Sequence, residues 1–183
     1  MGCYAHSNKL HTQLFRYDAV MPGTDPLTDE RLTVFGLFLE AHDGLLRRLR
    51  PQLSEHGLPH GEFEALLRMA RTHGGRLRMS DLAAQLSLST SGLSRLIDRL
   101  ERRDLAERQA CPTDRRGFFA AVTPGGRRLV ETAVRGHLDL VDQWFTGRFG
   151  PEELAQFEAT LRALRDRVHP GATAGSAGTA DPG

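Results

Sequence analysis

The chain has 183 residues and a mass of 20.3 kDa, the size of one domain or of one domain with an oligomerisation extension. Apolar residues make up 39% and charged residues 26% of it, and no apolar run approaches the roughly 18 residues of a membrane-spanning helix. No secretory signal is visible, and the two cysteines, Cys3 and Cys111, are too few for a disulfide framework. We therefore expect a cytoplasmic protein with no membrane partner.

The net charge is only +1, but the charge is unevenly distributed. Between Arg71 and Arg128 there are twelve arginines and six acidic residues, a local net charge of +6 in a nearly neutral chain. A basic segment of this kind favours a localised surface that binds a polyanion. A solvated arginine-rich surface would give the same count, so the charge alone does not decide between the two.

The first part of the chain is predicted to be a flexible arm followed by a helix. Residues 1–26 show no apolar periodicity and contain prolines and a glycine, so we expect no regular structure there. Thr28 is the expected N-cap of the first helix, because its hydroxyl can accept a hydrogen bond from the free backbone N–H groups. Apolar residues then recur at helical spacing until Pro51, where we expect the helix to end.

A helix-turn-helix is predicted in the middle of the chain. A helix over residues 62–72 ends at two glycines and leads into a short strand. Ser80 is the expected N-cap of a short helix over 81–86, and Ser89 that of a helix over 90–103. The apolar residues of this last helix recur at i, i+3, i+4 and i+7, which gives it one buried face: Leu93, Leu96, Ile97 and Leu100.

A β-hairpin is predicted directly after this motif. Residues 105–110 and 117–122 are the expected strands, and a segment rich in turn-forming residues, 111–116, joins them. Two helices followed by a hairpin are typical of a winged helix-turn-helix, in which the second helix enters the major groove of DNA and the hairpin forms the wing.

Two further helices are expected after the hairpin. Thr123 and Pro124 have the residue types of an N-cap and a first helical position, and this helix is expected to run to about Arg148. A last helix follows Gly150 and carries an apolar stripe with a coiled-coil-like spacing, which predicts dimerisation through Leu154, Phe157, Leu161, Leu164 and Val168. The expected fold is mainly α with a small β-hairpin wing, a winged helix-turn-helix plus a helical dimerisation region.

Double-stranded DNA is the partner that this arrangement predicts. Because one face of the helix over 90–103 is apolar, its hydroxyl and arginine side chains face outward, where they can donate to bases or phosphates. Arginines at the wing tip can enter the minor groove, and Asp114 can orient one of their guanidinium groups. The predicted DNA-binding residues are Thr90, Ser91, Ser94, Arg95, Arg99, Arg115 and Arg116.

Residues 28–168 resemble the MarR family of transcriptional regulators. The resemblance rests on the order and spacing of five motifs: Leu82-Ala83-Ala84-Gln85-Leu86, Ser89-Thr90-Ser91, Leu96-Ile97-Asp98-Arg99-Leu100-Glu101, Asp114-Arg115-Arg116 and Val122-Thr123-Pro124-Gly125-Gly126. It implies a homodimer that binds a palindromic operator and responds to small aromatic acids or oxidants. It also implies that Arg116 is the minor-groove residue and that Asp98 braces the recognition helix or the wing.

The resemblance divides the chain into an arm, a DNA-binding domain between dimerisation helices, and a tail. The expected boundaries are 1–26 for the flexible arm, 27–56 for the first dimerisation helix, 57–123 for the winged helix-turn-helix domain, 124–169 for the C-terminal dimerisation helices and 170–183 for a disordered tail. The tail contains mainly Gly, Ala, Ser, Thr and Pro and has nothing to bury.

A small-molecule effector is expected to bind where the dimerisation helices meet the winged domain. The residues proposed for this site are Phe38, His42, Phe63 and Arg68, with the arginine facing a carboxylate of the ligand. Aromatic residues at helical spacing are also what an ordinary core requires. With the effector site expected here, the resemblance implies a homodimeric repressor that is released from its operator by a small aromatic or anionic ligand.

Two alternatives to this function remain at the level of the sequence. Cys111 stands where the family usually has an acidic residue, and a thiol among Arg108, Arg115 and Arg116 would have a lowered pKa and would make the repressor redox-responsive. The winged helix could instead hold another protein without binding DNA. No metal site, cofactor or enzyme activity is expected, because no ligand spacing, phosphate loop or nucleophile motif is present.

Overall fold

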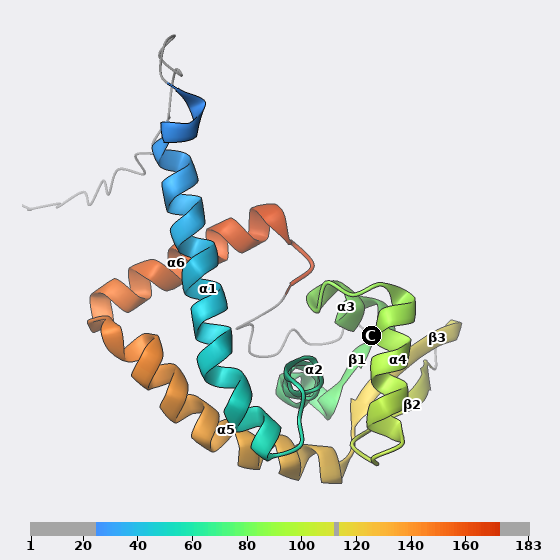
Figure 1. The fold of residues 1–183 in the computed structure, drawn as a ribbon. Helices are drawn as coiled ribbons and strands as arrows, with labels where there is room; N and C mark the ends of the chain where they lie inside the picture. Colours follow the sequence, from blue (N-terminus) through green and yellow to red (C-terminus); the bar gives the residue numbers. More distant parts are fainter. Residues whose placement is uncertain (1–24, 112–113, 173–183) are drawn as a thin grey trace, which may run out of the picture. The chain divides into compact units, whose positions relative to one another are not determined.

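The structure is a computed structural model that describes residues 25–111 and 114–172, with the backbone alone for residues 114–116 (Figure 1). Residues 1–24 of the arm predicted over 1–26, and residues 173–183 of the tail predicted over 170–183, lie outside the described residues. The chain divides into two compact units, residues 1–41 and 42–183, and the boundary falls inside helix α1.

Helix α1 (Glu30–Glu55) differs at both ends from the sequence expectation. Thr28 does not cap it but lies in a 3₁₀ turn, η1 (Pro26–Thr28), and Asp29 instead accepts a hydrogen bond from the backbone N–H of Arg31 at 2.9 Å. The predicted end at Pro51 is also wrong, because the helix continues through Pro51 to Glu55. Proline removes one backbone donor, but contacts further along, with a fully buried Leu53, hold the last turn in place.

The unit of residues 42–183 is mostly helical with a small antiparallel sheet, as expected. Its elements after α1 are α2 (His60–Arg71), η2 (His73–Gly75), β1 (Arg76–Arg78), α3 (Met79–Gln85), α4 (Thr90–Glu101), β2 (Ala106–Cys111), β3 (Asp114–Val122), α5 (Pro124–Trp144), η3 (Thr146–Arg148) and α6 (Pro151–Val168). The core is formed mainly where α2, α3, α4 and α5 meet the sheet, with Phe63, Leu66, Ile97, Leu100 and Val130 almost completely buried.

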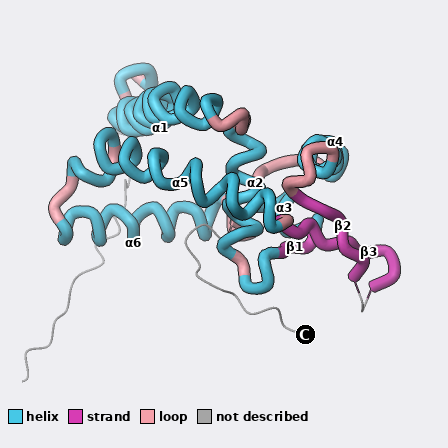
Figure 2. The backbone as a smooth tube through the Cα atoms, turned by 90° about the horizontal axis from the view of Figure 1, so that it is seen from below, coloured by secondary structure: helices cyan, strands magenta, loops and turns pink. Residues whose placement is uncertain are grey.

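The sheet has three strands in the order β1-β3-β2, with both pairs antiparallel (Figure 2). The hairpin strands reach closer to the tip than predicted: β2 has the predicted length but is shifted by one residue to end at Cys111, and β3 is three residues longer and begins at Asp114, which pairs with Cys111. The segment 111–116 is thus not a six-residue turn. Its composition favours a turn, but strand pairing extends into it as far as Cys111 and Asp114, with a change of register between Ala110 and Cys111.

Of the four predicted helix caps, two are confirmed and two, Thr28 and Ser80, are wrong. Ser89 accepts a hydrogen bond from the backbone N–H of Gly92 at 3.1 Å, and Thr123 accepts one from Gly126 at 3.0 Å. Ser80 is not a cap, since α3 begins at Met79 and the Ser80 hydroxyl bonds to the carboxylate of Asp81.

The start of α5 lies unusually close to the chain that precedes the hairpin. A Cβ atom on Gly126 would lie 2.0 Å from the backbone oxygen of Leu105, so only glycine fits at this position. This close approach joins the first turn of α5 to the base of the wing.

Helix α5 ends at Trp144 and not near Arg148 as predicted, and a short 3₁₀ turn leads to α6. Three phenylalanines fill this corner: the ring of Phe145 makes edge contacts with Phe149 and Phe157, and the last two rings stack 5.1 Å apart. The carboxylate of Glu153 accepts a hydrogen bond from the backbone of Gly150 at the start of α6. The corner orders the junction between the last two helices.

Candidate nucleic-acid interface

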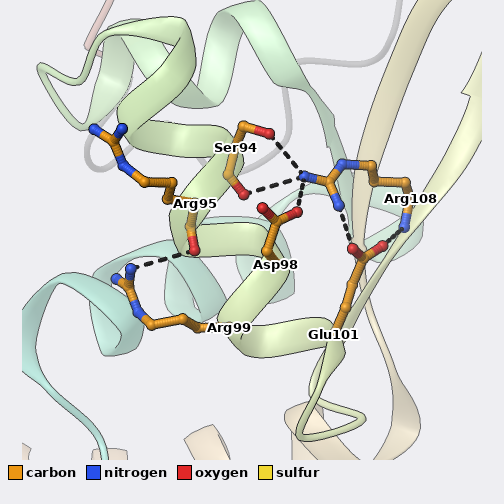
Figure 3. Close-up of polar contacts among 6 residues, drawn as sticks. All are labelled: Ser94, Arg95, Asp98, Arg99, Glu101 and Arg108. Carbon is orange, nitrogen blue, oxygen red and sulfur yellow. Dashed lines mark hydrogen bonds and ion pairs between the residues drawn. The ribbon is translucent and has the colours of Figure 1, made fainter.

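The polar side of α4 is the centre of the candidate interface. Leu93, Leu96, Ile97 and Leu100 are at most 5% exposed, so the opposite side of the helix faces away from the core. Thr90, Ser91 and Arg95 are exposed on it. The backbone oxygen of Arg95 accepts a hydrogen bond from Arg99, but its guanidinium makes no ion pair or hydrogen bond within the described chain, and Figure 3 shows it directed away from its neighbours.

The wing is attached to α4 through Arg108 of β2 (Figure 3). The guanidinium of Arg108 donates to Asp98 at 2.6 Å, and to the backbone oxygen and hydroxyl of Ser94 at 3.1 Å each. It also pairs with Glu101, whose carboxylate accepts a hydrogen bond from the Arg108 backbone at 2.9 Å. Asp98 thus contacts the wing strand, and the side chain of Ser94 is already bonded within the protein.

Arg99, predicted to bind DNA, is directed toward α2. Its Nε donates to Glu62 at 2.9 Å, and its Nη1 donates to the backbone oxygen of Arg95 at 3.2 Å. Glu62 also accepts a hydrogen bond from Arg103 at 2.8 Å. Helix α4 is therefore held by arginine–carboxylate pairs on two sides, toward the wing and toward α2.

The roles of Arg108, Glu101, Glu62 and Arg103 were not found from the sequence. Arg108 was noticed only as a cation near Cys111. Glu62 and Arg99 are 37 positions apart, and no periodicity of a single helix relates them. The sequence did contain one signal for these contacts. Glu62 is an acidic residue at a position expected to be buried, and a buried carboxylate requires partners.

The predicted wing-tip residues belong to β3, which begins at Asp114. The side chains of Asp114, Arg115 and Arg116 are outside the described part of the structure. Their predicted contacts with the minor groove therefore remain predictions.

A hollow of about 410 Å³ lies between the start of α4 and the base of the wing. Its lining combines hydroxyl groups, two guanidinium groups and two apolar side chains, from Arg78, Met79, Ser80, Thr90, Ser94, Arg108, Gly117 and Phe118. Two predicted DNA-binding residues, Thr90 and Ser94, thus line one concavity next to the wing.

The residues predicted to bind an effector are not all placed together. Phe63 is buried, with its ring 4.8 Å from that of His137 on α5, and Arg68 pairs with Glu64 on its own helix at 3.1 Å. His42 is exposed beside Asp43. Phe38 is 47% exposed and belongs to the unit of residues 1–41.

Several buried polar atoms near Phe63 have no hydrogen-bond partner. They are Gln52 Oε1, His60 Nδ1, Arg68 Nε and His137 Nδ1. Burial lowers the pKa of both histidines, and the charge of His60 lowers the pKa of His137 further. Both shifts favour the neutral form of the imidazole.

Cys111 is 6% exposed at the end of β2. Burial limits the access of an oxidant, and Arg108 directs its guanidinium to α4 rather than to an open loop. This geometry does not favour the redox alternative. Within residues 25–111 and 114–172, no three His, Cys, Asp or Glu side chains gather as a metal site, and no described helix is long and apolar enough to cross a membrane.

The predicted dimerisation stripe on α6 is largely open to solvent. Leu154, Phe157 and Leu161 are partly buried, whereas Leu164 is 48% and Val168 is 70% exposed. No residue of α6 is buried, and all of this helix lies within the described residues.

Comparison with known proteins identifies the family. The MarR family model matches residues 56–117, from the end of α1 to the wing. AbsC, a MarR family transcriptional regulator from Streptomyces coelicolor, is 31% identical; the match covers 80% of this chain and 99% of AbsC, with a TM-score of 0.73. The chain belongs to the MarR family.

Two further relatives agree with this assignment. Sco3205, a MarR family regulator from the same organism solved in complex with DNA, is 32% identical over 78% of this chain and 94% of its own, with a TM-score of 0.71. The transcriptional regulator MhqR of Bacillus subtilis is 26% identical over 64% of this chain and 79% of its own length. The protein is thus a winged-helix, DNA-binding transcriptional regulator of the MarR family.

Proposed function

We propose that this MarR-family regulator is a homodimeric repressor that binds a palindromic operator and is released from it by a small aromatic or anionic ligand. Helix α4 enters the major groove, and Arg115 and Arg116 of the wing contact the adjacent minor groove. The single observation that carries the proposal is the exposed guanidinium of Arg95, on a helix whose flanks are held by the wing and by α2.

The geometry of α4 supports base contacts near its N-terminus. Thr90 and Ser91 are small, exposed hydroxyl residues in the first turn, so they let the helix approach the base edges closely. Arg95 follows one turn later with all its donors available to bases or phosphates. Ser94 and Arg99 act differently in this proposal, because they position the helix from within the protein.

Dimerisation is supported by the exposed apolar residues of the C-terminal helices. Leu138 on α5 is 58% exposed, and Leu164 and Val168 on α6 are exposed to a similar or greater degree. A two-fold axis would bury the same patch on both copies. Two recognition helices about 34–36 Å apart would then reach successive major grooves of a palindrome.

Release by a ligand is supported by the unpartnered polar atoms of α1, α2 and α5. Arg68 Nε and the Nδ1 atoms of His60 and His137 are buried donors or acceptors that a polar ligand could satisfy. A ligand releases DNA only if it binds the geometry that does not fit the operator more tightly. Phe63 provides an aromatic contact next to them.

The test is a DNA titration by fluorescence anisotropy at fixed salt. The probe is a duplex that the wild-type protein selects from a random-sequence pool, compared with a scrambled duplex of the same composition. Arg95→Ala should weaken binding to the selected duplex by about 1–3 kcal/mol. Arg135→Ala, which removes an exposed arginine from α5, is the matched control and should bind as the wild type does.

The same titration tests release. Benzoate, a small aromatic anion, should weaken binding to the selected duplex, and mild peroxide should leave it intact because Cys111 is buried. Equal affinity for the selected and the scrambled duplex would contradict sequence-specific binding. Release by peroxide, with protection by Cys111→Ser, would replace the ligand mechanism by the redox one.

A further inference from the structure

Glu62 is a buried carboxylate that contacts the recognition helix directly. Its side chain is 5% exposed on α2. Oε1 accepts a hydrogen bond from Nε of Arg99 at 2.9 Å, and Oε2 accepts one from Nη1 of Arg103 at 2.8 Å. Each carboxylate oxygen therefore has its own guanidinium partner, one on α4 and one in the turn that follows it.

Both arginines are held by more than the carboxylate. Arg99 also donates to the backbone oxygen of Arg95 at 3.2 Å, and Arg103 donates to the backbone oxygen of Gly57 at 2.9 Å. Their side chains are 48% and 39% exposed, so each guanidinium group lies at the surface while its direction is determined from inside. Charge-assisted hydrogen bonds of this kind are among the strongest side-chain contacts.

Arg95, Arg99 and Arg103 follow one another at intervals of four positions, which places them along one side of α4 and its continuation. Of the three, Arg95 alone has a guanidinium with no partner in the described chain. If Glu62 carried no charge, all three arginines would be available along this side. A row of free arginines binds phosphates whatever the base sequence, because the backbone charge is the same everywhere.

We propose that Glu62 is a specificity-determining residue: it holds Arg99 and Arg103 away from the DNA phosphates and keeps α4 in the orientation in which Arg95 reads the operator. This inference rests on the proposed function. Specificity is a difference between two affinities, so limiting the binding to wrong sequences raises it as effectively as adding a base contact. Glu62 acts through the arginines and is a positioning residue.

The test replaces Glu62 by glutamine, which keeps the size of the side chain and removes its charge. Glu62→Gln should bind the scrambled duplex more tightly than the wild type does, and its plot of log affinity against log salt should steepen by about 1–2 units for two added phosphate contacts. The ratio of affinities for the selected and scrambled duplexes should fall by about tenfold. A purely structural role would weaken binding to both duplexes and would not steepen the salt dependence.

Glu64→Gln is the matched control. Glu64 lies on the same helix and pairs with Arg68 of that helix, so its loss frees no arginine of the recognition helix. Its salt dependence and affinity ratio should equal those of the wild type. In Glu62→Gln combined with Arg99→Gln, the salt dependence should return by about 1 unit toward the wild-type slope.

A variant that leaves Glu62 paired keeps the proposal testable if Glu62→Gln does not fold. Arg99→Gln alone leaves Arg103 on the carboxylate. It should leave the affinity for the scrambled duplex and the salt dependence unchanged, because Arg99 does not contact phosphate in the wild type. A slope shallower by about 1 unit would overturn the proposal, since it would show that Arg99 neutralises a phosphate.

The experiment distinguishes a failure of this inference from a failure of the proposed function. If the wild type discriminates between the two duplexes but Glu62→Gln keeps the same ratio and slope, the role of Glu62 is wrong and the regulator remains a specific DNA binder. If the wild type does not discriminate between them, the proposed function itself fails.

Discussion

Helices α4 and α6 have similar sequence patterns and opposite surroundings. Both carry an apolar stripe at helical spacing, and α6 is the longer, with 18 residues against 12. Yet four residues of α4 are buried, and none of α6 is. An amphipathic pattern shows that a helix has a side to bury but not which partner buries it. The stripe of α4 meets α3 and β2 of its own chain, whereas that of α6 leaves Leu164 and Val168 open.

The polar sides of the two helices differ in the same way. Charged residues on α6 pair with near neighbours, as in Arg162 with Glu158 at 2.8 Å and Arg165 with Asp166 at 2.9 Å. A pair at i, i+4 such as Arg162–Glu158 is worth about 0.2–0.5 kcal/mol, and it joins two residues of the same helix. The charged residues of α4 instead pair with other elements: Arg99 with Glu62 on α2, and Asp98 with Arg108 on β2. The contacts of α4 therefore orient it, as a recognition helix requires.

The largest effect should come from removing core volume under α4. Ile97 is completely buried, so Ile97→Ala should lower the free energy of unfolding by about 2–5 kcal/mol through lost contacts and a cavity. Val168→Ala on α6 removes two methyl groups from a side chain that is 70% exposed within its own chain. It should cost far less, apart from a part of the loss that depends on protein concentration through the proposed dimer. Urea denaturation of both variants at one protein concentration measures the difference. Equal losses would show that α6 is as well packed as α4 under these conditions.

A smaller effect should appear in the oligomeric state. Leu164→Glu places a charge on the exposed stripe of α6 and should raise the dimer dissociation constant at least about tenfold, equivalent to about 1.4 kcal/mol. Sedimentation velocity over a concentration series measures it. Ala163→Glu, one position along the helix and off the stripe, is the matched control and should dimerise as the wild type does. A wild type that stays monomeric at micromolar concentration would contradict dimerisation through α6.

The smallest effect should be a pH dependence of the free energy of unfolding, which arises from two half-buried histidines on α2 and α5 and not from α6. His60 on α2 and His137 on α5 have pKa values lowered by burial, so the folded protein takes up their protons less readily than the unfolded chain. Nearby Glu64 raises both pKa values in part, while Arg50 and His42 lower that of His60 further. Stability from the neutral imidazoles should be fully present above the unfolded pKa of about 6.5 and should decrease as the pH falls below it.

Urea denaturation at pH 7.5 and 5.5 checks this sign. His137→Gln should reduce the loss of stability at the lower pH, because it removes one of the two groups that take up protons on unfolding. His73→Gln, which changes an exposed histidine, is the control and should leave the pH dependence as in the wild type. An unchanged pH dependence in His137→Gln would show that its burial does not disfavour protonation.

The helices and strands were predicted best where local contacts decide them. Ser89 and Thr123 were recognised as caps, because a cap bonds to a backbone N–H three positions away. The buried side of α4 was predicted from its spacing. Thr28, Ser80 and Pro51 were misjudged, since each has a local preference that a tertiary contact or a competing neighbour overrides. The second hairpin strand was predicted too short because ladder pairing extends into residues that favour a turn.

Within the candidate site, the outward side of α4 was predicted, but the state of its side chains was not. Thr90, Ser91 and Arg95 are exposed, as the periodicity of the helix requires. Nothing in that periodicity distinguishes Arg95, whose guanidinium is available, from Arg99, which is bonded to Glu62. Position on a helix gives direction, whereas availability depends on what another element places opposite.

The sequence by itself determined the winged helix-turn-helix, its family and the side of α4 that faces outward, because these follow from spacings of a few residues and from motif order. Only the tertiary structure decided which arginines are available to DNA, that Arg108 joins the wing to α4, and that burial lowers the pKa values of His60 and His137. Glu62 and Arg99 are 37 positions apart, and Arg108 is 10 from Asp98. Contacts between separate elements, and the burial that shifts a pKa, exist only once the chain has folded.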